Sequence, residues 1–160
     1  MIIKNKIFKK TLIHTIFLIF LLASTTSKSN EALDIFQEAI NSEDRKHFIE
    51  LTREGFISRR DQIKENLIQG IENLRPTLPQ QVADGVFLIS VMNTGDGIYY
   101  HFTVADEYKN FDWYSYQISI ACYNAPTMMT LLAGFKYYYT YEYSNRANNK
   151  NFFISEENCP

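Results

Sequence analysis

Apolar residues in the first half of the chain recur at helical intervals. Residues 30–42 carry them three and four positions apart, which places them on one side of a helix. A second helix is predicted from Ser42 to an end at Gly55. A third is predicted from Ser58, which has an acidic residue three positions later as in a capping box, to the residue before Pro76. This half of the protein is therefore predicted to be helical.

The apolar period then changes from helical spacing to two. Residues 82–92 predict a strand with Phe87, Ile89 and Val91 on one face, and the glycine-containing segment 93–97 predicts a hairpin connection. The return strand, residues 98–104, has apolar side chains at its even positions and more polar ones at its odd positions. This pair of strands is predicted to be an antiparallel hairpin.

The last third of the chain predicts helix followed by strand. Residues 111–135 show helical spacing on both sides of Pro126, and a glycine ends the helical stretch. A final hairpin joins strands 135–143 and 151–155 through a polar turn. The predicted fold class is α+β: N-terminal helices, then a β-β-α-β-β unit whose antiparallel sheet packs on helices.

Strand 135–143 has an aromatic ring at every odd position, so these rings share one face. Two interpretations remain open: a sheet face packed under the helices, or a stacking surface for sugar rings, a peptide or a partner protein. Exposure is expected first at the end of this strand and on its opposite face. The candidate binding surface consists of Tyr99, His101, Tyr138, Tyr141 and Tyr143.

The first 27 residues are typical of a secretory signal peptide. Several lysines precede an apolar run over residues 11–23, which is shorter than the roughly 20 residues that cross a membrane. Small residues follow the run, and no cysteine near its end offers a site for lipid attachment. An uncleaved N-terminal anchor is the alternative. Cleavage leaves one α+β domain of residues 28–160, exported to the periplasm or secreted, with no stable membrane insertion.

Composition and charge agree with an exported globular domain. Of the 160 residues 46% are hydrophobic and 21% are charged, which is typical of one folded domain. The formal net charge is −2, and removal of the four lysines of the signal segment, Lys4, Lys6, Lys9 and Lys10, changes it to −6. An acidic domain lacks the charge that attracts nucleic acid or an anionic membrane surface.

The two cysteines, Cys122 and Cys159, are predicted to form a disulfide because exported chains enter an oxidising compartment. The alternative, a reactive or metal-bound thiol, would call for a C-x-x-C motif or further ligands at metal spacing. The sequence contains neither.

Several short segments of the second half form a recognisable pattern. They are Leu-Arg-Pro-Thr-Leu-Pro at 74–79, the strand at 87–91, Cys-Tyr-Asn-Ala-Pro at 122–126, Leu-Leu-Ala-Gly at 131–134, Tyr-Tyr-Tyr-Thr-Tyr at 137–141 and Ser-Glu-Glu-Asn-Cys at 155–159. Over residues 74–159 this pattern resembles the quorum-sensing-regulated virulence factor family of small exported bacterial proteins. The resemblance implies a compact α+β fold and the disulfide. It implies no activity, because regulation and export define the family.

No constellation of catalytic or metal-binding residues stands out in the sequence. After signal cleavage the histidines are His47 and His101, and no nucleophile elbow, zinc motif or phosphate-binding loop accompanies them. We therefore expect no catalytic residues, metal or cofactor. Acidic residues that lie close together in sequence could supply a carboxylate pair. They are Asp96, Asp106, Glu107 and Asp112.

Three functional hypotheses follow. The first is a non-enzymatic exported bacterial protein, with a virulence role if the resemblance holds, that binds a protein or a cell-surface component. The second is an envelope or extracellular hydrolase that uses a carboxylate pair or His101, favoured by a pocket joining His101 to Asp106 or Glu107. The third is a periplasmic accessory subunit or chaperone that adds a partner strand to a long, unprotected sheet edge.

Overall fold

The computed structural model describes residues 27–160, so the predicted signal peptide lies outside this range except for Ser27. The helical half comprises α2 (Ser27–Ile40), α3 (Arg45–Ile57) and α4 (Arg60–Leu74). None of the helices within residues 27–160 has the length and hydropathy needed to cross a membrane.

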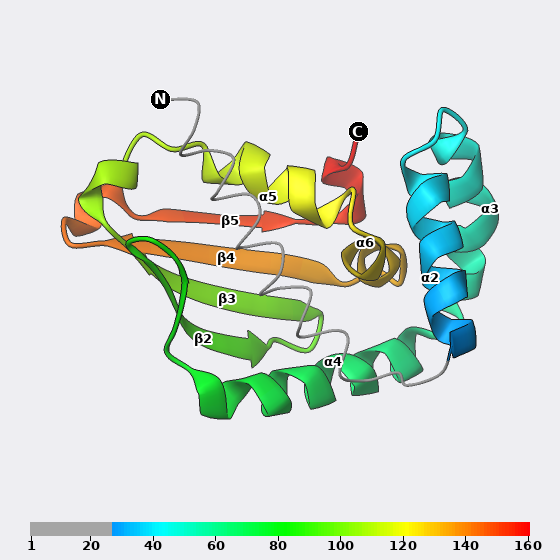
Figure 1. The fold of residues 1–160 in the computed structure, drawn as a ribbon, viewed down its shortest axis with the longest axis horizontal. Helices are drawn as coiled ribbons and strands as arrows, with labels where there is room; N and C mark the ends of the chain where they lie inside the picture. The colour runs from blue at the N-terminus through cyan, green and yellow to red at the C-terminus, as the bar shows by residue number, and fades with distance from the viewer. Residues whose placement is uncertain (1–26) are drawn as a thin grey trace.

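A five-stranded sheet forms the second half, and its strands lie side by side in chain order. They are β1 (Gln80–Ala83), β2 (Val86–Asn93), β3 (Gly97–Val104), β4 (Lys136–Tyr143) and β5 (Lys150–Ile154). The helices α5 (Trp113–Ala121) and α6 (Ala125–Leu132) connect β3 to β4. In Figure 1, α5 lies along β5 and α4 along β2, and α6 separates the sheet from α2 and α3. The predicted α+β fold class is confirmed.

The sheet is mixed, whereas the sequence predicts an antiparallel one. Strands β3 and β4 pair in parallel from Gly97 opposite Lys136 to Val104 opposite Tyr143, and the other three pairs are antiparallel. The connection through α5 and α6 is long enough to return the chain to the end at which β3 began. A crossover of this kind makes the next strand parallel.

The predicted strand 82–92 is two strands joined by a tight turn. Gly85 adopts a φ of +66°, a conformation that favours glycine, and a Cβ there would lie 2.8 Å from the Cβ of Ala105. A bulge between Leu88 and Ser90 then shifts the alternation along β2. Phe87, predicted to share one face with Ile89 and Val91, is therefore 40% exposed, whereas Leu88 and Val91 are buried.

Three of the predicted helix boundaries are wrong. Ser42 does not cap the second helix: its hydroxyl donates to the carbonyl of Ala39, and α3 begins at Arg45. Gly55 lies inside α3, which continues to Ile57, and it is not among the glycines that adopt a positive φ. Ser58 does not cap α4: its hydroxyl donates to the carbonyl of Gly55 instead, and α4 begins at Arg60. The end before Pro76 and the break around Pro126 are confirmed, since Pro126 occupies the first turn of α6.

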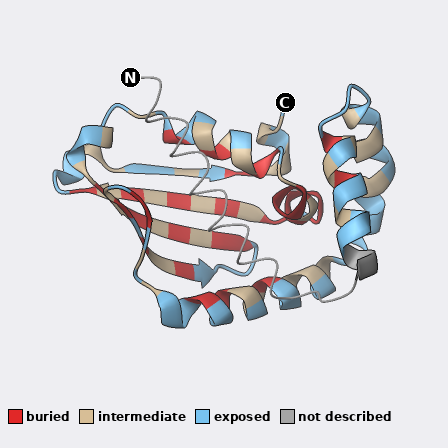
Figure 2. Ribbon diagram, in the orientation of Figure 1, coloured by how far each residue is buried: buried red, intermediate tan, exposed pale blue. Residues whose placement is uncertain are grey.

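The rings at the odd positions of strand 135–143 are core residues, so the packing interpretation is confirmed. Figure 2 shows buried residues alternating along β3 and β4 and filling α6. The Tyr141 ring stacks between Trp113 and Phe102, at centroid distances of 4.2 and 5.0 Å. Its hydroxyl accepts a hydrogen bond from Gln117 Nε2 (2.5 Å), and burial holds the pKa of Tyr141 well above its ordinary value. The aromatic strand thus anchors the helical layer.

Gly97 begins β3 where it meets β4. A Cβ at this position would lie 2.1 Å from the backbone oxygen of Lys136, so the two strands could not keep their spacing. We expect Gly97→Ala to lower the free energy of unfolding by about 1–3 kcal/mol, measured by urea denaturation. Gly55→Ala is the matched control: it meets no atom within 4 Å, and we expect a gain of about 0.5–1 kcal/mol. Equal effects of the two substitutions would contradict the close approach.

Candidate functional site

The face of the sheet opposite the aromatic core is half-buried to exposed along its length, and we call it the open face. Two of its rings, Phe87 and Phe153, are 40% and 48% exposed. Strand register brings its side chains side by side, because residues of one face recur at every second position. The open face consists of Phe87, Ser90, Met92, Tyr99, His101, Thr103, Lys136, Tyr138, Thr140, Glu142, Asn151 and Phe153.

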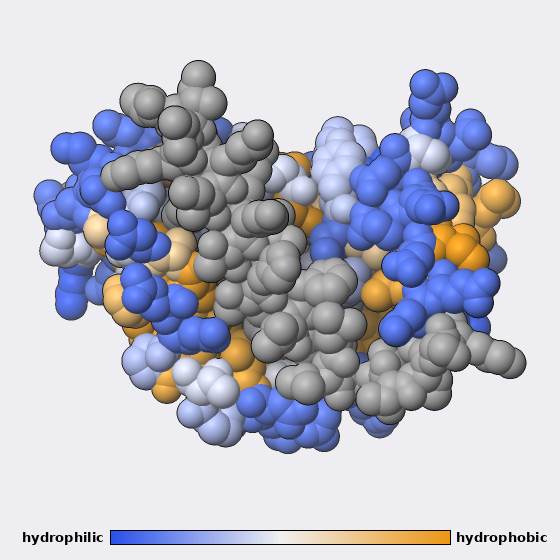
Figure 3. All heavy atoms as spheres, in the orientation of Figure 1, coloured by the Kyte–Doolittle hydropathy of each residue, from blue (hydrophilic) through white to orange (hydrophobic). Residues whose placement is uncertain are grey.

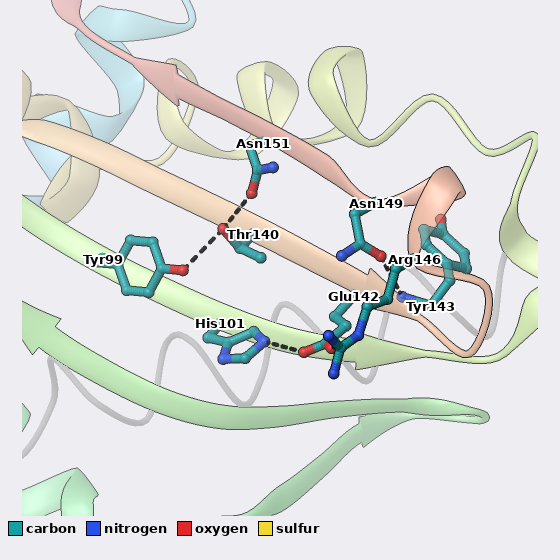
Figure 4. A network of polar contacts seen from close by, with 8 residues as sticks. All are labelled: Tyr99, His101, Thr140, Glu142, Tyr143, Arg146, Asn149 and Asn151. Atoms are coloured by element: carbon teal, nitrogen blue, oxygen red, sulfur yellow. Dashed lines mark hydrogen bonds and ion pairs between the residues drawn. The ribbon is translucent and has the colours of Figure 1, made fainter.

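A line of hydrogen bonds crosses the middle of the open face. The Tyr99 hydroxyl donates to Thr140 Oγ1 (2.9 Å), and Thr140 donates to Asn151 Oδ1 (2.6 Å). These residues come from β3, β4 and β5, and Figure 4 shows them in sequence across the three strands. The bonds restrict the rotation of the Tyr99 ring, which therefore forms an ordered part of the surface.

His101 is paired with Glu142, beside this line. His101 Nε2 lies 3.0 Å from Glu142 Oε2, and Arg146 Nε lies 3.7 Å from the other oxygen of the same carboxylate (Figure 4). Ser90 and Thr140 lie opposite His101 in the strand register, but among residues 27–160 the imidazole has its hydrogen bond with Glu142, and the Thr140 hydroxyl bonds to Tyr99 and Asn151 instead. Glu142 is therefore shared between a hydrogen bond with His101 and an ion pair with Arg146.

A solvent-facing cavity of about 530 Å³, here called the hollow, opens beside Glu142 at the C-terminal ends of β3 and β4. Its walls combine an exposed aromatic ring, two hydroxyls and both members of the Glu142–Arg146 pair. His101, Asp106 and Glu107 are not among its lining residues, so the hollow is not the pocket that the hydrolase hypothesis calls for. The lining consists of Gly85, Phe87, Thr103, Val104, Ala105, Glu142, Tyr143, Ser144 and Arg146.

The predicted carboxylate cluster is divided among separate structural roles. Asp96 accepts a hydrogen bond from the Tyr138 hydroxyl (2.8 Å), and this bond, followed by one from Thr94, lowers the pKa of Asp96. Asp112 caps α5 by accepting from the backbone N–H of Ser115, and Asp106 accepts from the hydroxyl of Ser144. Within residues 27–160 no group of three or more metal-ligating side chains could hold a metal ion.

The structure divides the predicted binding surface in two. Tyr99, His101 and Tyr138 lie on the open face, and the Tyr138 ring is near Phe153, with ring centroids 6.0 Å apart. Tyr141 and Tyr143 are 1% and 2% exposed, so their assignment to a surface is wrong. The hydroxyl of Tyr143 accepts from Trp113 Nε1 (2.7 Å) within the core.

Sequence reasoning missed Phe87 and Phe153 as surface residues. The alternation in strand 151–155 could have placed Phe153 on the same face as Asn151. Phe87 could not have been found in this way, because the bulge between Leu88 and Ser90 breaks the alternation that would place Phe87 on the same face as Val91.

The disulfide corner, defined as Cys122–Ala125 together with Cys159, holds the α2–α3 pair on the domain. The structure contains the Cys122–Cys159 disulfide. Gln37 donates to the Tyr123 carbonyl (2.8 Å) and accepts from the N–H of Ala125 (2.9 Å). Arg45 Nη2 donates to the Cys122 carbonyl (2.9 Å). The disulfide therefore has a structural role away from the open face.

The sheet offers no long free edge in the described part of the chain. Its edge strands, β1 and β5, contain 4 and 5 residues. β1 pairs only with residues 86–88, so the outer edge of β2 over residues 89–93 has no partner strand in the described part of the chain. These edges are short, and short edge strands limit the strand addition that the third hypothesis calls for.

Comparison with known proteins shows a shared fold. No protein-family model matches the sequence, and no curated protein matches it either. The structure is similar to that of a pilotin from the type 2 secretion system of Vibrio vulnificus, with a TM-score of 0.52 and 12% identity. It is also similar to the crystal structure of a Pseudomonas aeruginosa protein predicted to be secreted, with a TM-score of 0.53 and 11% identity. Each match covers 64% of this chain and 96% of the other. At these identities the likeness shows the fold alone.

Proposed function

We propose that this chain is an exported, non-enzymatic protein that binds a protein partner in or beyond the bacterial cell envelope through the open face of its sheet. The observation that carries the proposal is the contrast between the two faces. The tyrosines of one face are buried under the helices, whereas the other presents the exposed rings of Phe87 and Phe153 beside ordered polar groups.

The composition of the open face supports a protein partner. Aromatic rings supply large apolar area, and polar groups around them set orientation, as in the centres and rims of protein interfaces. Tyr138 is held by Asp96 and Tyr99 by Thr140, so these rings lose little freedom when a partner binds.

Export is supported by the N-terminal sequence and by the disulfide, which persists in oxidising compartments. The two structural neighbours, one from a secretion system and one predicted to be secreted, are compatible with this proposal. Membership in the quorum-sensing-regulated virulence factor family stays a prediction, as does the choice between periplasm and external medium.

The proposal predicts that substitutions on the open face remove the partner. After cross-linking in intact bacterial cells, one partner protein should be recovered together with this chain. We expect Phe87→Ala/Phe153→Ala to reduce the recovered amount of that partner by about tenfold or more. The reason is that both exposed rings are removed from the interface. Quantitative mass spectrometry of the cross-linked material measures the change.

Ile35→Ala/Leu51→Ala is the matched control, because these exposed apolar residues lie on α2 and α3. Figure 3 shows hydrophobic residues among hydrophilic ones on this side of the molecule. The control should recover the partner at the wild-type level. The proposal would be contradicted if the control variant lost the partner while the folded open-face variant still bound it at the wild-type level.

A further inference from the structure

We propose that the open face receives a basic segment of its partner, with an arginine or lysine side chain of that segment lying in the hollow. The inference rests on the proposed function and names the chemistry of the partner. It follows from the lining of the hollow, from the charge around it, and from an arginine of this chain that already occupies its rim.

The lining suits a cation with an apolar stem. Phe87 presents a ring over which a guanidinium or ammonium group can lie, and the Glu142 carboxylate can accept charge-assisted hydrogen bonds. Thr103 and Ser144 also line the hollow, and their hydroxyl oxygens can accept further hydrogen bonds. A neutral or anionic side chain could not make both the contact with the Phe87 ring and the charge-assisted hydrogen bonds with Glu142.

Negative charge exceeds positive charge at this end of the sheet. Asp106 accepts a hydrogen bond from Ser144 (2.6 Å), and Glu107 Oε1 lies 4.0 Å from the position of a Cβ on Gly85, so both carboxylates flank the hollow. Asp84 precedes Gly85 in the chain. Burial, and then the charges of Glu107 and Asp84, raise the pKa of Tyr108, which lies beside them. The sequence of residues 28–160, with a formal charge of −6, adds to the attraction for a basic partner.

Arg146 is the single cation among the described residues that line the hollow, and it lies at the rim beside Glu142. Its Nε lies 3.7 Å from Glu142 Oε1, while its side chain is 86% exposed. An exposed ion pair of this length is weak, so an incoming arginine can displace it at little cost. Arg146 therefore shows that a guanidinium group fits beside Glu142, and it competes with the partner for that carboxylate.

The test uses the purified ¹⁵N-labelled protein and two peptide probes, acetyl-Gly-Arg-Gly-amide and its neutral citrulline analogue. We expect the arginine peptide to shift the backbone amides of Gly85, Thr103 and Ser144 along one saturable curve. The citrulline peptide should bind at least about tenfold more weakly. Glu142→Gln should weaken the arginine peptide about tenfold, and Arg146→Ala should strengthen it severalfold, because the internal competitor is gone.

Equal binding of the two peptides, or unchanged binding by a folded Glu142→Gln variant, would overturn the inference. Shifts confined to residues outside the hollow would overturn it as well. Failure here is distinguishable from failure of the proposed function. If the peptides do not bind but Phe87→Ala/Phe153→Ala still loses the partner in cells, the open face binds a partner of different chemistry.

Discussion

Replacing both cysteines, as Cys122→Ala/Cys159→Ala, is expected to lower the free energy of unfolding by about 4 kcal/mol. The two cysteines are separated by 37 residues in sequence, and the loss follows from the larger conformational freedom of the unfolded chain without the cross-link. Such a loss is a large part of the roughly 5–15 kcal/mol that stabilises a typical domain. Urea denaturation of the variant and of the wild type gives the difference directly.

Reduction of the wild-type protein is the matching control, because it removes the same cross-link without a substitution. It should give a similar loss, and intact mass should rise by two hydrogens. The α2–α3 pair should loosen first, since Gln37 and Arg45 bind the backbone beside Cys122. A loss below about 1 kcal/mol in both experiments would contradict a structural role for the bond.

Tyr141→Ala is expected to cost about 3–5 kcal/mol of unfolding free energy, the range for truncating a buried aromatic side chain. The substitution empties the space between Trp113 and Phe102 and leaves Gln117 Nε2 without its acceptor in a buried position. Thermal and chemical denaturation followed by Trp113 fluorescence would report the change, because Trp113 stacks on Tyr141 at 4.2 Å.

Tyr138→Ala is the matched control on the same strand, with its side chain on the opposite face. We expect a stability change within about 1 kcal/mol, because Tyr138 is only half-buried and its hydroxyl bonds to the exposed Asp96. The same variant should weaken partner binding. If the two substitutions destabilised the protein equally, the assignment of Tyr141 to the buried face and Tyr138 to the open face would be contradicted.

Local patterns were sufficient to predict most of the secondary structure. Strand β3 alternates in burial as predicted, and Pro126 separates two helices because it fits only the first turn of the second. The aromatic period of strand 135–143 was also read correctly as one face. These features depend on residues close together in sequence, which is why they could be predicted.

The parts that could not be predicted depend on distant segments. The parallel pairing of β3 with β4 is set by the path of the chain through α5 and α6. The bulge between Leu88 and Ser90 belongs to the pairing with β3, and it puts Phe87 and Val91 on opposite faces of the sheet. Whether Tyr141 or Tyr138 faces solvent depends on which side the helices cover, and no pattern within the strand contains that information.

The candidate site, too, could be predicted from the sequence only where it depends on residues close together in the chain. Tyr99, His101 and Tyr138 could be named from strand alternation alone. The His101–Glu142 pair and the hollow could not, because they require β3 and β4 to lie side by side in one register. The sequence showed acidic residues near one another, but the fold separates Asp96 from Asp106 at opposite ends of the sheet.

Photo-cross-linking in living cells tests the central claim, binding through the open face, most directly. A photoreactive phenylalanine analogue would replace Tyr138 or Phe153 on the open face, and Tyr114 on α5 as an exposed control. The account predicts that both open-face positions cross-link to the same host protein and that position 114 does not. Cross-linking of that protein from position 114, with none from positions 138 and 153, would contradict it.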